Sequence, residues 1–520
     1  MKSSGLHKLT GLALAAIIAG GLLAPAAFAQ DAAPPAAPAA AEATVAPAAE
    51  AAPAAEAAPT AAAEAAPAAE AAAPTVDKGD TTWMLVSTVL VLLMILPGLA
   101  LFYGGLVRQK NMLSMLMKVS TVTVIGMIAW LLYGYSLAFT DGGGLDKFVG
   151  GAGRLFLKDV TPASNVATFS TGIYIPELAF IAFQMTFAAI TACLVLGGVA
   201  ERIKFSATLL FAVIWPIIVY YPMAHMVWWW AGATSGAGVP AADTAAGAGL
   251  LWGWGAIDFA GGTVVHINAG IAALVGAIFL GKRSGYQKEP IPPHSLTLTL
   301  VGAGLLWVGW FGFNAGSNLE ANGYAALAMV NTFLATAAAG FSWTLTEWIT
   351  RKKASMLGMA SGMVAGLVAV TPAACFAGPM GALILGLIVS PICIIFCSAV
   401  KNALKYDDSL DAFGIHAIGG IVGAMGTALV VNPAWGGQGI VDYSTCGAGG
   451  VDIATCQSAY DLSFQVMAQV KAVLFTIAWS GVGSTIVFFV IKMITGLRVS
   501  PETEEEGLDI SEHGERAYHS

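Results

Sequence analysis

The sequence predicts an all-α polytopic membrane protein, and its composition, its long apolar segments and the placement of its charges support that prediction. Of the 520 residues, 57% are hydrophobic and only 10% are charged. Soluble globular chains carry about 25% charged residues, so one water-soluble core could not cover this much apolar surface. The composition argues against a soluble enzyme, a nucleic-acid-binding protein and a disulfide-stabilised scaffold.

The net charge of −8 is carried by the two ends of the chain. Acidic residues gather before residue 81 and after residue 497, whereas the segment between them is slightly basic. The acidity therefore says nothing about the charge of a substrate.

The N-terminal 29 residues have the three parts of a secretory signal peptide. Lys2 and Lys8 form a basic start, and an apolar run follows roughly over residues 9–23. Ala-Phe-Ala at 27–29 offers the small residues that signal peptidase reads. We expect cleavage before Gln30, and the alternative is an uncleaved first helix.

Residues 30–80 form an Ala/Pro/Glu-rich spacer. Proline recurs every few residues and blocks a continuous helix, and almost nothing in the segment can be buried. We expect a disordered periplasmic spacer. Association with the cell wall is the alternative.

Eleven apolar segments follow, in a membrane domain expected over residues 81–497. Each is close to the ~20 residues that cross a bilayer as a helix. They run roughly over 83–107, 118–139, 177–198, 206–230, 259–280, 296–316, 325–349, 355–372, 379–401, 414–431 and 465–493.

The basic residues orient these spans. A signal peptide places the mature N-terminus outside, and most of the 23 Lys and Arg then lie in the inner connections. This positive-inside bias supports an odd number of spans and puts a tail, residues 498–520, in the cytoplasm. The outer connections contain only Lys78, Lys147, Arg154 and Lys158.

Spans five and ten repeat one pattern. Asp258 opens span five, and His266 lies about 12 Å deeper at 1.5 Å per residue. Asp411 precedes span ten, and His416 lies inside it. Because these two spans run in opposite directions, the pattern predicts an inverted repeat of five plus five helices and a final helix. The repeat would bring the two histidines together near mid-membrane.

Two neutral imidazoles can share a hydrogen bond and can hand along a molecule that both donates and accepts. The alternative is two separately satisfied buried histidines. No third ligand accompanies either histidine, which argues against a metal site. We expect Asp258 and Asp411 to cap helices as structural support, and we interpret His225 as structural.

Aromatic residues gather where the outer ends of spans three, four and six should meet. Ring faces attract a cation within about 6 Å, and the Ser317 hydroxyl adds an acceptor, so a small monovalent cation is favoured over an anion. An interfacial aromatic belt is the alternative, and we assign Trp229 and Trp230 to that belt. The candidate cation site contains Phe183, Phe187, Trp228 and Phe313.

Several strings resemble one family. Asp258-Phe-Ala-Gly-Gly-Thr-Val-Val-His266-Ile-Asn-Ala-Gly270 resembles the signature of the ammonium transporter (Amt/Mep/Rh) family, bacterial Amt type. The resemblance covers about residues 81–520. Further matching strings are Phe102-Tyr103-Gly-Gly105, Pro222-Met-Ala-His225-Met-Val-Trp228, Gly309-Trp-Phe-Gly-Phe313-Asn-Ala-Gly-Ser317, Phe413-Gly-Ile-His416 and the tail from Gly496 to Gly514.

The resemblance implies ammonium/ammonia transport across the inner membrane by a homotrimer with a pore in each subunit. It implies no enzymatic activity and no cofactor, a PII-type signalling protein as the cytoplasmic partner, and methylammonium as a substrate analogue. Asp258 matches an aspartate that supports the external site. The implied site residues are Trp228, Phe187 and Ser317 for recruitment, Phe187 and Phe313 for a phenyl gate, and His266 and His416 for the pore.

Two other functions remain open. An ammonium sensor would signal through its PII-type partner, but family members of that kind carry appended signalling domains and this tail is short. A Rh-like gas channel is a weaker fit because of Trp228 and Ser317.

The cysteines divide by location. Cys446 and Cys456 lie in the long outer loop 432–463, which faces an oxidising compartment in this topology, so we expect a disulfide between them. Two free thiols are the alternative. Cys193, Cys375, Cys393 and Cys397 lie in or beside spans, and we expect them to be reduced packing residues.

Overall fold

The computed structural model describes residues 75–170, 173–230, 248–441, 457–458 and 460–518. The predicted signal peptide, nearly all of the spacer, and Cys446 and Cys456 lie outside the described residues, so the predictions that concern them remain predictions.

Within the described residues, eleven helices are long and apolar enough to cross a membrane, as the sequence predicts. The first four spans are α2 (Lys78–Leu93), η2 (Met94–Leu99) and α3 (Ala100–Leu106); η3 (Gln109–Asn111), α4 (Met112–Ala129), η4 (Trp130–Gly134) and α5 (Tyr135–Phe139); α6 (Glu177–Val199); and α7 (Phe205–Trp215), η7 (Pro216–Tyr220) and α8 (Tyr221–Trp228). The fifth is η8 (Gly262–Ile267) and α12 (Asn268–Leu280), and the sixth is α13 (Leu296–Gly316).

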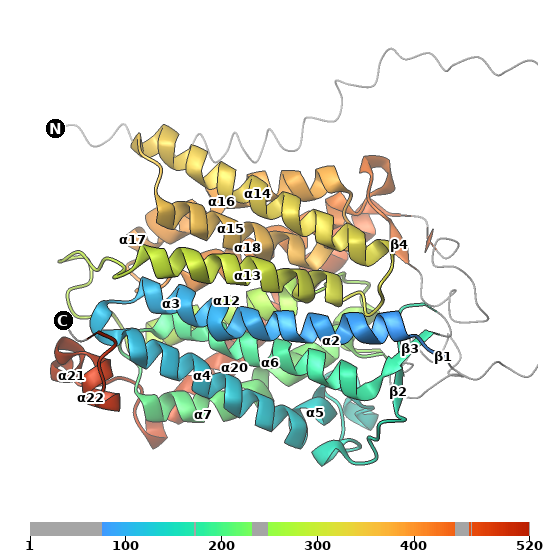
Figure 1. Ribbon diagram of the computed structural model, residues 1–520, viewed down its shortest axis with the longest axis horizontal. Coiled ribbons are helices and arrows are strands. Elements are labelled where there is room, and N and C mark those ends of the chain that lie inside the picture. The colour runs from blue at the N-terminus through green and yellow to red at the C-terminus, as the bar shows by residue number, and fades with distance from the viewer. Residues whose placement is uncertain (1–74, 171–172, 231–247, 442–456, 459, 519–520) are drawn as a thin grey trace, which may run out of the picture. The chain divides into compact units, whose positions relative to one another are not determined.

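The remaining five spans complete the bundle. They are α14 (Gly323–Arg351); α15 (Met356–Val370) and η9 (Thr371–Ala373); α16 (Pro379–Ile395), η10 (Phe396–Val400) and α17 (Lys401–Leu404); η11 (Phe413–Ala417) and α18 (Ile418–Val430); and α20 (Leu462–Ile494). The spans run side by side, with the strands β1–β3 at one end of the bundle and the C-terminal helices at the other (Figure 1). We call these ends outer and inner, after the predicted orientation.

Close backbone approach explains why glycine is frequent in the spans. A Cβ atom at Gly302 in span six would lie 2.2 Å from the backbone nitrogen of Phe102 in span one. A Cβ at Gly198 in span three would lie 2.5 Å from the carbonyl oxygen of Ala273 in span five. Small residues let helices pack this closely where lipid supplies no hydrophobic drive between them.

Short strands organise the outer end. β1 (Thr75–Val76) pairs in parallel with β3 (Ile173–Pro176), which pairs antiparallel with β2 (Asn165–Ala167) in the register Val166↔Ile175. β4 (Ile440–Val441) and β5 (Gln457–Ser458) form a second antiparallel pair. Short helices in the outer connections are η5 (Gly143–Leu145), η6 (Leu155–Leu157), α11 (Leu250–Gly253) and η12 (Pro433–Trp435).

A buried ion-pair network joins the inner connections. Glu201 is paired with Arg283 at 2.9 Å and with Arg108 at 3.1 Å, and Arg283 is also paired with Asp407 at 2.8 Å. Burial favours the neutral acid and would raise the pKa of Glu201, but the two guanidinium groups outweigh it and lower the pKa to about 2. The carboxylate therefore stays charged and cross-links spans two, three and five at their inner ends.

The C-terminal tail packs against the inner end as α21 (Pro501–Glu506) and α22 (Leu508–His513). Asp509 accepts the backbone N–H groups of Leu113 and Ser114 at 3.1 and 2.8 Å, and so caps the start of α4. Glu504 accepts from Arg498 at 2.6 Å. The tail is thus part of the folded bundle.

The start of span two was predicted too late in the chain. The sequence places it at residue 118 because Lys118 resembles a flanking basic residue, but the span begins at Gln109 and Lys118 lies inside it, 3% exposed. The ammonium of Lys118 lies 2.9 Å from the Glu512 carboxylate of the tail. That partner, distant in sequence, is what allows a lysine at this depth.

Glu512→Gln should therefore destabilise the protein, because it leaves a buried ammonium without its counter-charge. The expected loss is about 3 kcal/mol, seen as a lower unfolding midpoint of the purified protein in detergent. Glu515→Gln is the matched control, since that side chain is exposed. Equal midpoints for the two variants would contradict the role assigned to Glu512.

Candidate functional site

Three cavities follow one another between the outer and inner ends of a single chain. The outer cavity is lined by Trp228 and Phe187, and the central cavity by Phe313, His266 and His416. The rings of Phe187 and Phe313 are stacked with centroids 4.1 Å apart and planes 18° apart, so this ring pair separates the two cavities. The inner cavity shares Phe102 with the central one.

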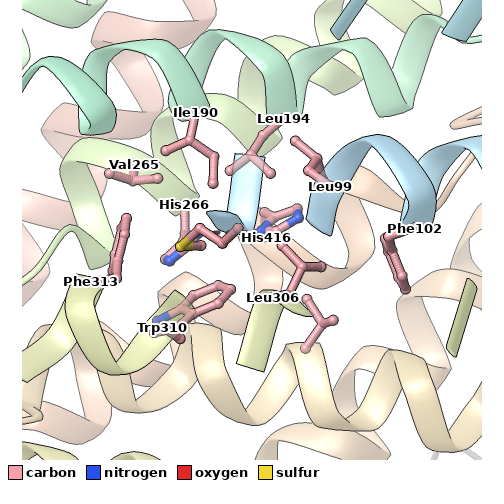
Figure 2. Close-up of a pocket in the computed structure, with 12 residues that line it drawn as sticks. Leu99, Phe102, Ile190, Leu194, Val265, His266, Leu306, Trp310, Phe313 and His416 are labelled. Atoms are coloured by element: carbon pink, nitrogen blue, oxygen red, sulfur yellow. Dashed lines mark hydrogen bonds between the residues drawn. The ribbon is translucent and has the colours of Figure 1, made fainter. Parts of the chain in front are cut away.

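The central cavity is narrow and apolar. It offers about 10 Å³ to the centre of a water-sized molecule, enough for about one such molecule, against about 310 Å³ in the inner cavity. Aliphatic side chains and Trp310 surround the two histidines, as Figure 2 shows. A molecule in this space is removed from bulk water.

His266 and His416 meet in the central cavity, as the repeat predicts. Their Nδ1 atoms are 3.3 Å apart, and the ring planes differ by 16°. One ring donates a hydrogen bond through Nδ1 and the other accepts it. The donor ring therefore has a lone pair on its Nε2 atom, and the acceptor ring has a proton on its Nε2 atom. The Nε2 atom of His266 is buried without a hydrogen-bond partner among the described residues. It can donate to, or accept from, a small polar molecule in the cavity.

The two histidines occupy equivalent places in the two repeats. Each lies in a π-helical turn, η8 or η11, that opens the span and is followed by a 13-residue α-helix, α12 or α18. Because π-helical turns also occur in other spans, at η2, η4, η7 and η10, the equivalence rests on the shared position of the histidines within the turn. The shared local geometry turns both imidazoles toward the same point between the spans.

Asp258 caps span five as predicted. Its carboxylate accepts the backbone N–H groups of Gly261, Thr263 and Val264 at 2.9, 2.8 and 3.0 Å, and also that of Gly262. Gly261 has φ +114°, a backbone conformation that glycine adopts without strain. This conformation lets the chain turn into the span. The start of η8, and with it His266, is therefore fixed by one side chain.

The cap of span ten is Asp408, and the prediction that Asp411 caps this span was wrong. Asp408 accepts the N–H groups of Ala412 and Phe413 at 3.1 and 2.8 Å. Asp411 has a left-handed backbone, φ +59°, and its carboxylate turns away from the helix start to pair with Lys401. Burial, together with the nearby Asp411 carboxylate, raises the pKa of Asp408.

Trp228 stands over the phenyl pair. Its ring packs edge-on against Phe187, with centroids 5.8 Å apart and an interplanar angle of 85°. Its indole N–H donates to the backbone oxygen of Asp258 at 2.8 Å. Asp258 therefore holds Trp228 through its backbone while its side chain caps span five.

Ser317 and Gln184 add acceptors to the outer cavity. The Ser317 hydroxyl donates to the Phe313 carbonyl at 2.8 Å, which leaves its lone pairs free. The Oε1 atom of Gln184 is buried without a hydrogen-bond partner among the described residues. Sequence reasoning missed Gln184, although an amide in a mostly apolar span, three residues before Phe187, was a usable signal.

Trp310 was also missed as a site residue. Its ring is stacked on His266 with centroids 5.3 Å apart, and its indole N–H donates to the Thr371 hydroxyl at 2.9 Å. The indole thus fixes one face of the His266 ring. Phe183, predicted in the aromatic group, packs against Phe187 at 4.9 Å behind the ring pair.

The assignment of Trp229 and Trp230 to an interfacial belt was wrong. Trp229 is 2% exposed and stacks on the buried His225. Trp230 lines the outer cavity and stacks on Trp252. Three consecutive tryptophans point in different directions from the end of α8, because the chain leaves the helix at Trp229.

The cysteines and a metal site can be judged only for the described residues. There, Cys193, Cys375, Cys393 and Cys397 are free thiols, and no cluster of three metal-ligating side chains is found.

The comparisons with known proteins agree on one family. The model of the Ammonium Transporter Family matches residues 82–518. The ammonium transporters of Aquifex aeolicus (strain VF5) and Bacillus subtilis (strain 168) are 41% and 40% identical to the chain; each comparison covers 85% of the chain, and 94% and 99% of the relative.

Solved structures give the same result. A structure described as a sensor Amt protein is similar with a TM-score of 0.70 and 26% identity, covering 84% of the chain and 98% of that structure. Mep2 of Saccharomyces cerevisiae is similar with a TM-score of 0.68 and 29% identity, covering 82% and 88%.

The crossing of spans five and ten gives a prediction. A Cβ atom at Gly270 would lie 2.3 Å from the backbone nitrogen of Ala417, next to His416. Gly270→Ala should therefore push the spans apart and cost about 1–3 kcal/mol, measured as a lower unfolding midpoint. Gly304→Ala is the control, because nothing lies within 4 Å of its Cβ position. A Gly270→Ala midpoint no lower than that of Gly304→Ala would refute the close crossing.

Proposed function

The chain belongs to the ammonium transporter family, and from this premise we propose that it carries ammonium across the inner membrane as ammonia, through a pore within the subunit. One observation carries the proposal above all others: a hydrogen-bonded histidine pair in a narrow apolar cavity, directly beneath two stacked phenyl rings. A neutral molecule can pass such a cavity more readily than an ion.

Recruitment begins in the outer cavity. The ring faces of Trp228 and Phe187 attract a cation in partial exchange for its water. Ser317 and Gln184 supply oxygen acceptors for N–H groups, and the Gln184 amide oxygen has no other partner among the described residues. The aromatic and acceptor groups together suit an ion that both carries positive charge and donates hydrogen bonds, which is ammonium.

Deprotonation follows from the cost of moving the ion inward. An unpaired charge in a water-excluded apolar space loses its hydration, at a cost of many kcal/mol. Ammonia avoids that cost, and it can donate and accept hydrogen bonds along the His266–His416 pair. Potassium has no proton to lose, so the same barrier excludes it. Phe187 and Phe313 act as the gate, because their rings must separate for passage.

The assembly and its partner extend the proposal. All three cavities are lined by residues of one chain, which supports a separate pore in each subunit of a homotrimer. Exposed apolar residues on spans one and seven, such as Val89 and Phe341, suit contacts with neighbouring subunits or lipid. The open inner cavity, beside a folded cytoplasmic tail, suits a PII-type protein that plugs it from inside.

A sensor is the second candidate, since a solved structure described as a sensor Amt protein resembles the chain. A sensor would bind ammonium in the same outer cavity without sustained flux. Transport is favoured because a wide inner cavity, which shares Phe102 with the central one, follows it, a feature that binding alone does not need.

Methylammonium uptake and membrane current in proteoliposomes test the proposal. Trp228→Leu removes a cation–π contact worth about 1–2 kcal/mol, so the half-saturation concentration should rise about tenfold. Flux without current would support conduction of the neutral form, whereas a matching current would mean that the charge crosses as well, either as a separate proton or within the intact ion.

Trp348→Leu is the control for that experiment, because this tryptophan is 62% exposed on α14 and lines none of the three cavities. Binding of methylammonium without flux or current in the wild-type protein would reject transport and favour the sensor.

A further inference from the structure

His225, near the outer end of span four, makes contacts that the proposed transport does not use. The ring is fully buried, and each of its nitrogens faces a backbone carbonyl. Nδ1 lies 3.0 Å from the Ala138 oxygen, and Nε2 lies 2.7 Å from the Asp146 oxygen. A neutral imidazole has one N–H and can donate to only one of these oxygens. Two carbonyl acceptors call for a proton on both nitrogens.

The surroundings of the ring also favour a cation. Ala138 lies in the last turn of α5, where carbonyls lack intrahelical partners and the helix dipole is negative. The Asp146 carboxylate is 3.7 Å from Nε2, and the Asp141 carboxylate acts on the ring from the same loop. Lys147, the next residue, directs its ammonium to the Ala248 oxygen at 2.9 Å.

Burial opposes this charge, because desolvation penalises the imidazolium. Against that stand two direct acceptors, a helix end and a nearby carboxylate, all of which favour the charged ring. A neutral ring would instead place a nitrogen lone pair against a carbonyl lone pair at hydrogen-bond distance. The contact geometry therefore supports the imidazolium.

His225 connects the outer loop that follows α5 to the end of α8, where Trp228 lies. Trp229 stacks on the His225 ring at 5.6 Å and 19°, and its indole N–H donates to Asp146 Oδ1 at 3.1 Å. Gly142 donates its backbone N–H to the same oxygen at 2.9 Å. The end of α8 is thus held against the outer loop directly beside Trp228.

We propose that His225 is a positioning residue, which as an imidazolium fastens the outer loop to the end of span four and so sets where Trp228 stands over the outer cavity. The inference rests on the proposed recruitment of ammonium at Trp228. Both carbonyl bonds need a proton on each ring nitrogen, so this support is present at low pH. It is lost as rising pH removes the second proton and one carbonyl bond with it, so substrate affinity falls as external pH rises.

The charge of His225 can be read without any transport assay. In the full-length protein with isotope-labelled histidine, His225→Gln assigns the ring signal by its disappearance. We expect both nitrogens to be protonated at neutral pH. Asp146→Asn keeps an oxygen acceptor for Trp229 but removes the negative charge. The His225 ring should therefore lose its second proton at a lower pH than in the wild type. A single protonated nitrogen at neutral pH would overturn the proposal.

The half-saturation concentration for methylammonium, at constant concentration of the ion, tests the consequence. It should rise about fivefold in the wild type as the second proton is lost, and at lower pH in Asp146→Asn. His225→Phe keeps a ring against Trp229 and should show the weak affinity at every pH. A purely structural role would not move the pH profile with Asp146.

His294→Phe serves as the control, since that ring lies at the inner end, where Nδ1 bonds the Val107 carbonyl and Nε2 the Tyr518 hydroxyl. If His225→Phe keeps the wild-type affinity for methylammonium while Trp228→Leu still weakens it, the positioning role is refuted. A wild-type protein that does not move methylammonium would instead refute the proposed function, while the ring signals would still report the charge.

Discussion

The cost of placing a charge in the apolar middle of the bundle governs the rest of the structure. Elsewhere the chain meets that cost by pairing: Lys118 lies against Glu512, and Glu201 against Arg283. The central cavity contains no such counter-charge, only the His266–His416 pair in an apolar lining. A site built this way accepts a polar molecule and rejects an ion, and the aromatic cavity above it collects the ion that must first lose its proton.

Asp258 ties these two parts together. Its side chain fixes the turn that presents His266, and its backbone oxygen holds the indole of Trp228. Recruitment and conduction are therefore anchored to one residue that lines neither the outer nor the central cavity. In the second repeat Asp408 fills the capping role, but no tryptophan is bonded to it among the described residues. The two repeats are therefore alike at their histidines and differ in what their capping residues hold.

The spans and the histidine pair could be predicted from the sequence, because span length and a repeated Asp–His pattern are local signals. The predictions that were wrong depended on contacts distant in sequence or on the backbone angle of a single residue. Lys118 could not be placed inside a span without knowing about Glu512. Three acidic residues, at 407, 408 and 411, precede span ten. Asp407 pairs with Arg283, and Asp411, with its left-handed backbone, pairs with Lys401, so Asp408 is left to cap the span. Three consecutive tryptophans carry no sequence signal for the direction of each ring.

The central claim, that the histidine pair passes a neutral molecule and excludes ions, is tested most directly by the paired flux of methylammonium and potassium in one population of proteoliposomes. The wild-type protein should carry methylammonium and no potassium, and His266→Ala should either lose methylammonium flux or admit potassium. An unchanged methylammonium flux in His266→Ala, with potassium still rejected, would contradict the account.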